Sequence, residues 1–471
     1  MLELTYQFDD TVNTPKYIQL YNYIKKEIES GHIPSHTRLP SIRSLSKQLG
    51  VNKITIESAY DQLISEGYLE SRPKSGYFVQ AIDTHFFKRL TEAYSPEDDF
   101  LRLETQHYDI DFNDNKIDED HFPLSVWRKI TAKVLNDCPD YVFQHGSTQG
   151  DAGLRHELKT YLHHSRGVNC SEDQIIIGAN SQYLMILLLH IIGMKKGTVG
   201  MEEPGYHLMA KVFEDAGYSL EPVPLEADGL NVSVVKDMNP DLVFVSPSHQ
   251  YPLGMTLPIQ KRIGLLEWAR QSGAYIIEDD ILSELRYSGT TIPSLQGLDR
   301  AGRVIYMGTF FKSLLPSLRV GYMVLPKALI QRYNESFYLY QQTASLIHQK
   351  TIELFMKEGH WDRHLLRMRK VYRKKRDRMV EAIQAYMGSK ARVLGEKTGL
   401  HVVIQINDAR DENELVRIAA NHSINVSGTS HMWYDPANNL FEQPTFILGF
   451  GGLREQEINP GIKALSEAWF N

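Results

Sequence analysis

The spacing of apolar residues near the start of the chain predicts three short helices. Between residues 17 and 30, apolar side chains recur every three or four positions, and the run ends at Gly31. Ser41 has the side chain of a helix N-cap and begins a second helix, which Gly50 ends. Asn52 can cap a third helix, whose apolar positions stop at Gly67. We therefore predict three consecutive helices in this segment.

A hairpin pattern follows the third helix. Residues 68–71 and 77–79 are rich in aromatic and aliphatic side chains, and the turn between them contains Pro73 and Gly76. Three helices followed by a two-stranded wing are typical of a winged helix-turn-helix. We therefore predict that residues 1–80 form such a domain, rich in α-helix.

From about residue 121 onward, helical spacing alternates with short runs of β-branched and aromatic residues. The runs are residues 174–177, 198–199, 242–245, 274–277, 304–307 and 320–324. Such alternation favours an α/β fold with a mostly parallel sheet that helices cover. We place this large lobe at residues 121–330 and a smaller α+β lobe at residues 331–471.

Charge is distributed unevenly along the chain. Residues 83–120 contain twelve acidic and four basic residues without sustained periodicity, which predicts an acidic linker at residues 81–120. This segment more than accounts for the net charge of −7 of the 471-residue chain, so the overall acidity does not exclude a nucleic-acid partner.

Two cysteines, Cys138 and Cys170, exclude a disulfide framework and lack metal-ligand spacing. Without a signal-peptide pattern or a long apolar stretch, the chain is expected to be cytoplasmic and to have no membrane partner.

The predicted third helix and the wing carry side chains suited to DNA. A helix in the major groove needs a polar outer face, and Lys53 and Thr55 lie on the side away from the apolar positions. Cations before this helix and at the wing tip suit phosphate contacts. The candidate DNA-binding residues are Arg38, Arg43, Lys53, Thr55, Arg72, Lys74 and Ser75. The alternative interpretation is a module that contacts only other proteins.

Two runs in this segment closely resemble the DNA-binding domain of the GntR family. They are Arg38-Leu-Pro-Ser-Ile-Arg-Ser-Leu-Ser-Lys-Gln-Leu-Gly-Val51 and Ala59-Tyr-Asp-Gln-Leu-Ile-Ser-Glu-Gly-Tyr68. The resemblance implies that the partner is a double-stranded DNA operator. The family usually has Ser-Arg-x-Thr-Val where this chain has Asn52-Lys-Ile-Thr-Ile56. Lysine keeps the positive charge at that position but lacks the bidentate fork of arginine.

A second set of residues, between Gly178 and Arg319, has the parts of a site for pyridoxal phosphate. Such a site needs a lysine for a Schiff base, an acid beside the pyridine nitrogen, donors and a cation for the phosphate, and an aromatic face for the ring. Each part has a candidate near the end of a predicted strand, where α/β sheets bind ligands. The candidates are Lys312, Asp279, Arg319, the loop of residues 178–182, and Tyr206.

This ordered set resembles fold-type I aminotransferases, and most closely the MocR/GabR-type regulators of the GntR family. In those regulators a winged helix is joined by a linker to an aminotransferase-like domain. The similarity covers nearly the whole chain and includes residues 202–206, 246–254 and 306–326. It implies that Lys312 forms the Schiff base and that Asp279 pairs with the pyridinium nitrogen. It also implies phosphate contacts by Arg319, Thr309, Ala179, Asn180 and Ser181, ring stacking by Tyr206, and a place near the ring edge for His249 or Gln250.

The chain departs from the family pattern at several positions. Phe311 stands where the family often has serine, and Ile281 stands where a tyrosine often bonds the ring hydroxyl; losing a hydrogen bond to an ionised group costs about 1.5–3 kcal/mol. The GABA-responsive member binds the ligand carboxylate with arginines, and the matching positions here are His207 and His431. Histidine is a weaker, pH-dependent partner for a carboxylate. We therefore expect an amino-acid or amine effector other than GABA.

Together these features predict a transcriptional regulator that uses pyridoxal phosphate to sense its effector, and not an enzyme in ordinary turnover. The resemblance implies a head-to-tail homodimer in which each winged helix lies over the core domain of the partner. Two alternatives stay open: a working aminotransferase with a DNA-binding arm, and a regulator that has lost the cofactor and binds another small molecule. Nine basic residues within the stretch 363–378 are interpreted as a solvated helix face, with DNA or subunit contact as the alternative.

Overall fold

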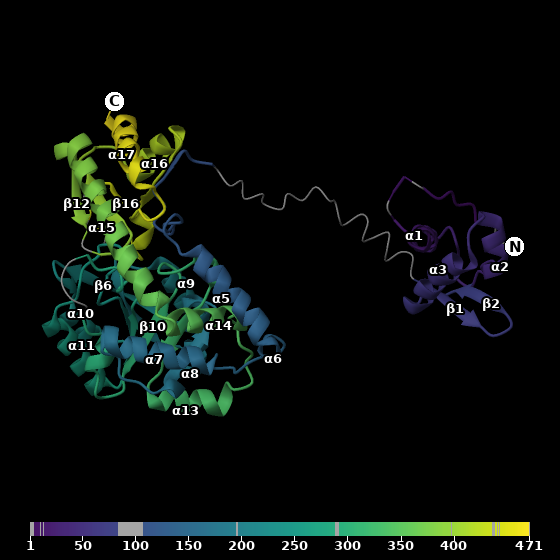
Figure 1. Cartoon of the computed structure of the whole chain (residues 1–471), viewed down its shortest axis with the longest axis horizontal. Coiled ribbons are helices and arrows are strands. Elements are labelled where there is room, and N and C mark those ends of the chain that lie inside the picture. The colour runs from purple at the N-terminus through teal and green to yellow at the C-terminus, as the bar shows by residue number, and fades with distance from the viewer. Residues whose placement is uncertain are drawn as a thin grey trace. The chain divides into compact units, whose positions relative to one another are not determined.

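The computed structural model describes residues 4–9, 11–12, 14–82, 107–194, 196–287, 292–396, 398–435, 439, 441 and 443–470. The chain divides into two compact units, Met1–Thr105 and Gln106–Asn471 (Figure 1). Each unit has its own hydrophobic core.

The first unit contains the three predicted helices and the wing. Its elements are α1 (Lys16–Glu29), α2 (Ile42–Leu49), α3 (Lys53–Ser65), β1 (Leu69–Arg72) and β2 (Gly76–Val79), the two strands being antiparallel. The Ser41 side chain accepts a hydrogen bond from the backbone N–H of Ser44, and Asn52 does the same for Ile54. Gly50 ends α2 in the left-handed region, with φ at 66°. The winged helix-turn-helix predicted from the caps and the apolar spacing is thereby confirmed.

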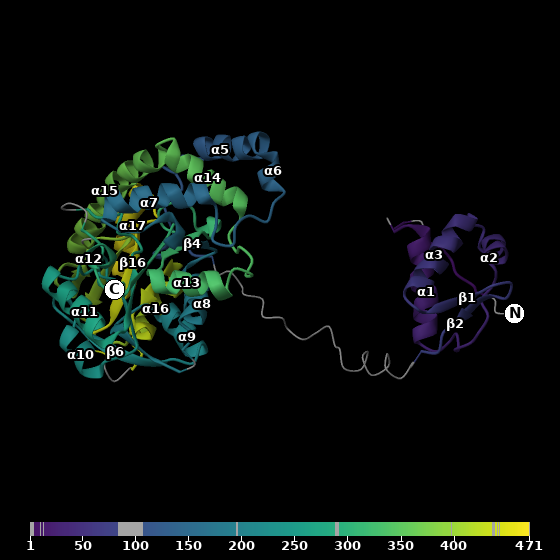
Figure 2. The same ribbon diagram turned by 90° about the horizontal axis from the view of Figure 1, so that it is seen from below.

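The core of the first unit explains how α3 is held. Ile56, Tyr60 and Leu63 on α3 are fully buried against Leu20 and Ile24 of α1. The Tyr60 hydroxyl also donates to the carbonyl of residue 40, which precedes α2, at 2.9 Å. Figure 2 shows α3 beside α1, and residues on the other side of α3, such as Lys53 and Glu57, are exposed to solvent.

An eight-stranded sheet forms the centre of the second unit. Its order is β4-β11-β10-β9-β8-β5-β6-β7, and the pairs from β10 through β9, β8 and β5 to β6 are parallel. Antiparallel neighbours occur only towards its two ends among the described strands, at β4, β11 and β7. The strands are β4 (Ile175–Gly178), β5 (Thr198–Glu203), β6 (Ser219–Glu226), β7 (Gly229–Leu230), β8 (Leu242–Val245), β9 (Tyr275–Asp279), β10 (Val304–Thr309) and β11 (Gly321–Val324). The predicted, mostly parallel sheet is confirmed.

Helices cover both faces of this sheet, as alternating strand residues show. Ile176 and Met307 pack in one cluster with α8, α9 and α13, whereas Ile177 and Tyr306 pack in another with α7 and α14. The helices of this lobe are α5 (Leu124–Asp137), α6 (Pro139–Val142), α7 (Ala152–Arg166), α8 (Ser181–Ile192), α9 (His207–Asp215), α10 (Val232–Met238), α11 (Ile259–Ser272), α12 (Leu295–Leu298), α13 (Lys327–Ser336) and α14 (Leu346–Lys357).

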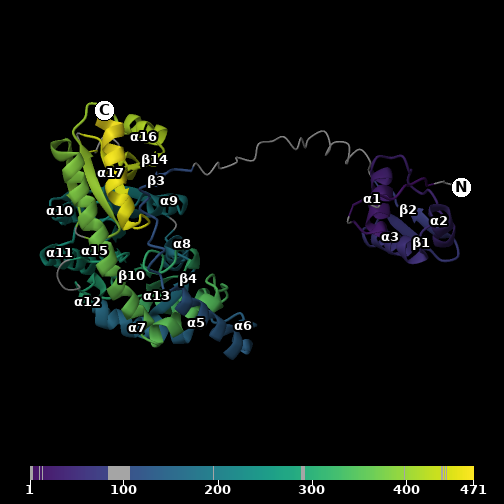
Figure 3. The ribbon, with the colours of Figure 1, turned by 45° about the horizontal axis from the view of Figure 1, so that its top comes forward.

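A four-stranded antiparallel sheet and three helices build the smaller lobe, above the large sheet in Figure 3. The strands follow the order β12 (Ala391–Gly395), β13 (His401–Ile406), β16 (Thr445–Gly449) and β15 (Ser427–Gly428). The helices are α15 (His360–Tyr386), α16 (Glu412–Asn421) and α17 (Glu455–Phe470). A separate parallel pair joins β3 (Ile110–Asp111) to β14 (Ile424–Asn425).

Two boundaries differ from those expected. Residues 107–120, expected in the linker, belong to the second unit, where Phe112 is fully buried and β3 pairs with β14. Three of their acidic side chains, Asp114, Asp118 and Asp120, have cationic partners far along the chain, including Lys375 for Asp118 at 2.6 Å. Helix α13, which crosses the expected boundary at residue 330, contacts α8 of the large lobe, and α14, expected in the small lobe, contacts α5 of the large lobe. The remaining linker residues, 83–106, lie outside the described part.

The basic run on α15 is only partly a free surface. Lys375 is buried and pairs with Asp118, while Lys374 and Arg378 both reach Glu455 on α17. Part of the basic run therefore forms ion pairs that hold α15 against other segments of the second unit. No helix in the described part of the chain is both long enough and apolar enough to cross a membrane.

Candidate functional site

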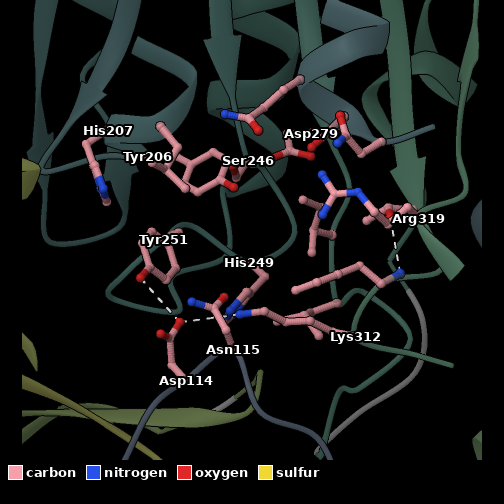
Figure 4. A pocket seen from close by; sticks show the side chains of 18 residues that line it. Asp114, Asn115, Tyr206, His207, Ser246, His249, Tyr251, Asp279, Lys312 and Arg319 are labelled. Carbon is pink, nitrogen blue, oxygen red and sulfur yellow. Dashed lines mark hydrogen bonds and ion pairs between the residues drawn. The ribbon is translucent and has the colours of Figure 1, made fainter. Parts of the chain in front are cut away.

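A cavity of about 430 Å³ lies in the second unit beside the carboxyl ends of the parallel strands. Eighteen side chains line it (Figure 4): Asp114, Asn115, Asn180, Ser181, Gln182, Tyr206, His207, Leu208, Ser246, His249, Tyr251, Asp279, Ile281, Leu282, Thr309, Phe311, Lys312 and Arg319. Open α/β sheets bind ligands at this edge, because consecutive strands present their following loops there.

Three charged residues from two parts of the chain meet at this cavity. Asp279 is the last residue of β9, and Lys312 follows β10. Arg319 follows a short 3-10 helix, Pro316–Leu318, and has a left-handed backbone with φ at 48°. The sequence spacing had assigned these three residues to one site, and the fold places them around one space.

The Asp279 carboxyl is buried at the cavity wall. Burial raises its pKa to about 7, and the nearby charges of Asp280 and Glu278 add to the effect. Behind it, Asp280 is held by Arg166, with Nε 2.7 Å from Oδ2, and accepts a hydrogen bond from the Tyr306 hydroxyl. Asp280 therefore supports the floor of the site, whereas Asp279 faces the cavity and can gain from a cationic partner.

The end of the cavity near α8 suits an anion. Asn180 caps α8 by accepting from the backbone N–H of Tyr183 at 2.9 Å, and Ser181 and Gln182 line the space with Thr309 and Arg319. Ala179 is different from its neighbours. Its N–H donates to the Thr343 hydroxyl at 2.9 Å, and its side chain is not among those that line the cavity.

His249 and Gln250 have different environments. His249 lines the cavity, contacts the Thr398 hydroxyl through Nδ1, and has a buried Nε2 without a hydrogen-bond partner in the described structure. Burial, helped by His401 and Lys312, holds the pKa of His249 well below its usual range, so the ring is neutral. Gln250 points elsewhere: its amide donates to the carbonyl of residue 204 at 2.8 Å and so fixes the loop.

Tyr206 and His207 line the side of the cavity away from Lys312 in Figure 4. His431 is not a lining residue, but its ring meets that of His207 edge to face, with centroids 4.4 Å apart. Burial lowers the pKa of His207, and the neighbouring His431 lowers it further. His207 therefore offers a neutral imidazole to a ligand near neutral pH.

Sequence reasoning missed a group that lies beside Lys312. The Asp114 carboxylate is 3.3 Å from the Lys312 Nζ and accepts a hydrogen bond from the Tyr251 hydroxyl, also at 3.3 Å. Asn115 lines the same wall. Tyr251 could have been found, because it belongs to the run 246–254 already noted, but no local pattern marked Asp114 within its acidic neighbourhood.

Two of the departures from the family pattern, Ile281 and Phe311, face the cavity. Ile281 and Phe311 are lining residues, and each supplies an apolar surface where the family often has a hydroxyl. The site therefore keeps its charged residues and is more apolar around them.

On the first unit, α3 and the wing present the candidate DNA-binding residues to solvent. Lys53 is exposed, Thr55 is half-buried, and Ile54 between them is 66% exposed. At the wing, Lys74 and Ser75 are exposed, and Arg72 lies over the Phe78 ring while pairing with Glu70 at 3.1 Å. The remaining two candidates, also exposed, are Arg38 and Arg43.

Comparisons with known proteins bear on both units of the chain. Residues 16–79 match the family of bacterial regulatory proteins named gntR. The chain is 39% identical over 470 residues to the HTH-type transcriptional regulator YdeL of Bacillus subtilis, covering 99% of this chain and 100% of YdeL. It is 31% identical to the "Probable rhizopine catabolism regulatory protein MocR" of Rhizobium meliloti, covering 98% of this chain and 95% of MocR.

A kynurenine aminotransferase of Pyrococcus horikoshii, solved in complex with PMP, matches with a TM-score of 0.68 and 25% identity, covering 83% of this chain and 94% of that one. The chain therefore belongs to the GntR family of bacterial transcriptional regulators and is of the MocR type, with a winged helix-turn-helix followed by an aminotransferase-like domain.

Proposed function

We propose that this regulator binds pyridoxal phosphate (PLP) in its aminotransferase-like unit and responds there to an amino acid or another primary amine. The observation that carries the proposal is the meeting of Lys312, Asp279 and Arg319 around one cavity. The end of β9 and the connection between β10 and β11 supply these residues, and each residue has a chemistry that a different part of PLP requires.

The cavity fits PLP at three points. Asp279 is buried with a raised pKa, so a pyridinium N–H would give its carboxylate the cationic partner that burial demands. Arg319 and the N-terminal end of α8, with Asn180 and Ser181, suit a phosphate. Lys312 supplies a primary amine at the wall of the same cavity. When bound, PLP supplies an aldehyde that condenses with primary amines and a ring that withdraws electrons from the product.

The side chains around the cavity have separate roles in this proposal. Lys312 holds the cofactor and is the group that an incoming amine has to replace. Asp279 holds a proton at the ring nitrogen, and Tyr206 offers an aromatic face. His249, kept neutral by burial, offers a ring nitrogen to a hydrogen-bonding partner without adding charge. An amine that binds here can shift the population between two conformations of the unit, which is the form in which a ligand regulates.

DNA recognition belongs to the first unit in this proposal. The operator is double-stranded, α3 enters the major groove with Lys53 and Thr55, and the wing tip with Lys74 contacts the backbone. A head-to-tail homodimer would present two winged helices to two half-sites.

A second candidate function is turnover as an aminotransferase, which the likeness to the kynurenine aminotransferase favours. Against it, the described lining residues include one lysine, Lys312, and one arginine, Arg319. The proposal assigns both of them to binding PLP. A ligand carboxylate would therefore meet His207 in place of an arginine. Amino transfer from a panel of amino acids to 2-oxoglutarate, followed for many turnovers, would support this function over sensing.

Uptake of PLP tests the proposal. Purified full-length protein incubated with PLP is expected to turn yellow, to lose the colour with borohydride, and to carry the reduced cofactor on the Lys312 peptide in mass spectrometry. Lys312→Ala is expected to abolish this adduct, whereas Lys327→Ala, an exposed lysine on α13, keeps it.

A wild-type protein that takes up no PLP under these conditions would overturn the cofactor assignment. It would favour a sensor whose cavity, with Phe311 and Ile281, binds another small molecule.

A further inference from the structure

We propose that Asp114 is a positioning residue for Lys312, holding the lysine ammonium whenever the lysine is not joined to the cofactor. Asp114 would thereby set how readily an incoming amine replaces Lys312. This inference rests on the proposed binding of PLP and names the residue that regulates occupancy of the same site.

The contact is a nearly buried ion pair between distant parts of the chain. The Lys312 Nζ and the Asp114 Oδ2 are 3.3 Å apart, and the two side chains are 9% and 10% exposed. The Tyr251 hydroxyl donates to the same carboxylate oxygen, so dashed lines from two sides meet at Asp114 in Figure 4. A buried carboxylate with a cation and a hydroxyl donor is strongly tied to that cation.

Asp114 is ionised in this environment. Burial by itself would raise the pKa of its carboxyl, but the charge of Lys312, aided by the hydrogen bonds from Lys312 and Tyr251, outweighs burial and lowers the pKa. The carboxylate therefore favours a neighbour that carries a full ammonium charge. Lysine bears that charge when it is free.

The backbone that presents Asp114 is fixed at several points. The N–H of Gly449 donates to the carbonyl of Phe112 at 2.7 Å, and a Cβ on Gly449 would come within 2.5 Å of the Asp114 Cα. The Asn113 side chain accepts from the N–H of Asn115 at 2.8 Å and so closes a turn around Asp114. Because the turn is held on both sides, the carboxylate cannot simply follow Lys312 when the lysine moves.

The role of the Asp114–Lys312 pair follows from the reaction in which an incoming amine replaces Lys312. An ammonium enters and an ammonium leaves: a carbon–nitrogen bond forms to the incoming amine, the bond to Lys312 Nζ breaks, and the protons given up by the incoming nitrogen end on Nζ. No oxidant or reductant is needed. The released Lys312 ammonium then has a carboxylate partner in Asp114, which favours release over retention.

The charge-neutral variant Asp114→Asn makes this testable, because the predicted changes run opposite to those that damage to the site would cause. The variant is expected to need about five- to tenfold more methylamine than wild type to displace PLP from Lys312, and to bind PLP more tightly, since the free lysine has lost its partner. Damage to the site would instead weaken PLP binding. Borohydride trapping followed by intact-protein mass gives the fraction of Lys312 that still carries the cofactor.

Three further variants sharpen the test. Asp111→Asn removes a carboxylate from the same segment that pairs with Lys116 outside the cavity lining, and is expected to behave as wild type. Asp114→Glu keeps the charge and is expected to restore displacement towards the wild-type value. Asp114→Ser repeats the neutral test if the asparagine variant does not fold.

The outcomes separate the two proposals. If wild type forms no PLP adduct on Lys312, the proposed function fails and this inference fails with it. If wild type forms the adduct but Asp114→Asn or Asp114→Ser is displaced at the wild-type methylamine concentration, only the positioning role of Asp114 is overturned.

Discussion

At the scale of single residues, Arg166 carries a charge whose removal should be costly. It is buried against Asp280, with Nε–Oδ2 and second N–O distances of 2.7 and 3.0 Å. Arg166→Leu would leave that carboxylate buried and unpaired, and is expected to lower the free energy of unfolding by about 3–5 kcal/mol. Urea unfolding followed by tryptophan fluorescence reports on this unit, because all five tryptophans lie beyond residue 120.

An exposed ion pair provides the comparison. Lys211 pairs with Asp215 at 2.7 Å on the surface of α9, and Lys211→Leu is expected to change stability by less than about 1 kcal/mol. Equal losses of unfolding free energy in Arg166→Leu and Lys211→Leu would contradict the prediction that an unpaired buried charge is more costly than an unpaired exposed one. Adding Asp280→Leu to Arg166→Leu should recover part of the loss, since no buried charge then stays unpaired.

The raised pKa of Asp279 predicts a pH dependence of stability. The folded protein holds this proton up to about pH 7, whereas the unfolded chain releases it near its ordinary value of about 4. The cofactor-free protein therefore loses stability from this group as pH rises between those values. Relative to Asp279→Asn, which does not titrate, wild type should lose on the order of 1–3 kcal/mol between pH 5 and pH 8.

Urea midpoints of both proteins at four pH values within this range measure the difference. Asp140→Asn, at an exposed position on α6, should run parallel to wild type. If the curves for wild type and Asp279→Asn are also parallel, the carboxyl is not perturbed by burial. Saturating PLP should flatten the wild-type curve, because a pyridinium stabilises the ionised acid.

Individual site residues were predictable only where they belong to an ordered pattern. Asp279 ends β9, whereas Lys312 and Arg319 both lie between β10 and β11, close enough in sequence to be recognised together. Asp114 could not be found in this way. Its partner lies 198 positions later, and a count of charge treats a buried carboxylate and a solvated one alike.

At the scale of elements, α3 and the wing should contribute to DNA binding mainly through charge. Lys53 and Lys74 are exposed, and each phosphate contact releases counterions when DNA binds. Lys53→Ala with Lys74→Ala is expected to weaken binding to any duplex and to reduce the slope of log affinity against log salt by about two. Fluorescence anisotropy with one labelled duplex over a range of salt concentrations gives that slope.

A cation elsewhere in the same unit controls for net charge. Lys26 is exposed in the last turn of α1, and Lys26→Ala should keep the wild-type slope. A double variant at Lys53 and Lys74 that retains the full slope would mean that α3 and the wing do not contact phosphates.

Elements with strong local signals were predictable, and those made by tertiary pairing were not. The helices of the first unit have caps at Ser41 and Asn52 that the sequence displays directly. Strand β6, Ser219–Glu226, shows no such signal, since it contains Pro222 and Pro224 and only one of its side chains is buried. Its pairing with β5 makes it a strand, and that partner is not visible in local sequence.

At the scale of the whole molecule, one exposed phenylalanine and one exposed leucine on the second unit bear on the proposed homodimer. Phe143 is 90% exposed and Leu339 is 75% exposed, although both are large apolar side chains. An interface between two copies of the chain that covered these side chains would remove their apolar surface from water. We expect wild type to sediment at twice the chain mass, and Phe143→Asp with Leu339→Asp to sediment as a single chain.

Loss of the dimer should also change DNA binding without touching the first unit. Two winged helices on one duplex gain affinity from linkage, so the dissociated variant should bind a duplex with two half-sites about 100-fold more weakly and a single half-site as wild type does. Ile263→Asp, at a 52% exposed position on α11, should keep both the mass and the affinity of wild type. A wild-type protein that sediments as one chain, or a double variant that stays dimeric, would contradict this surface. A dissociated variant with undiminished affinity for the two-site duplex would show that the two winged helices bind DNA independently of the dimer.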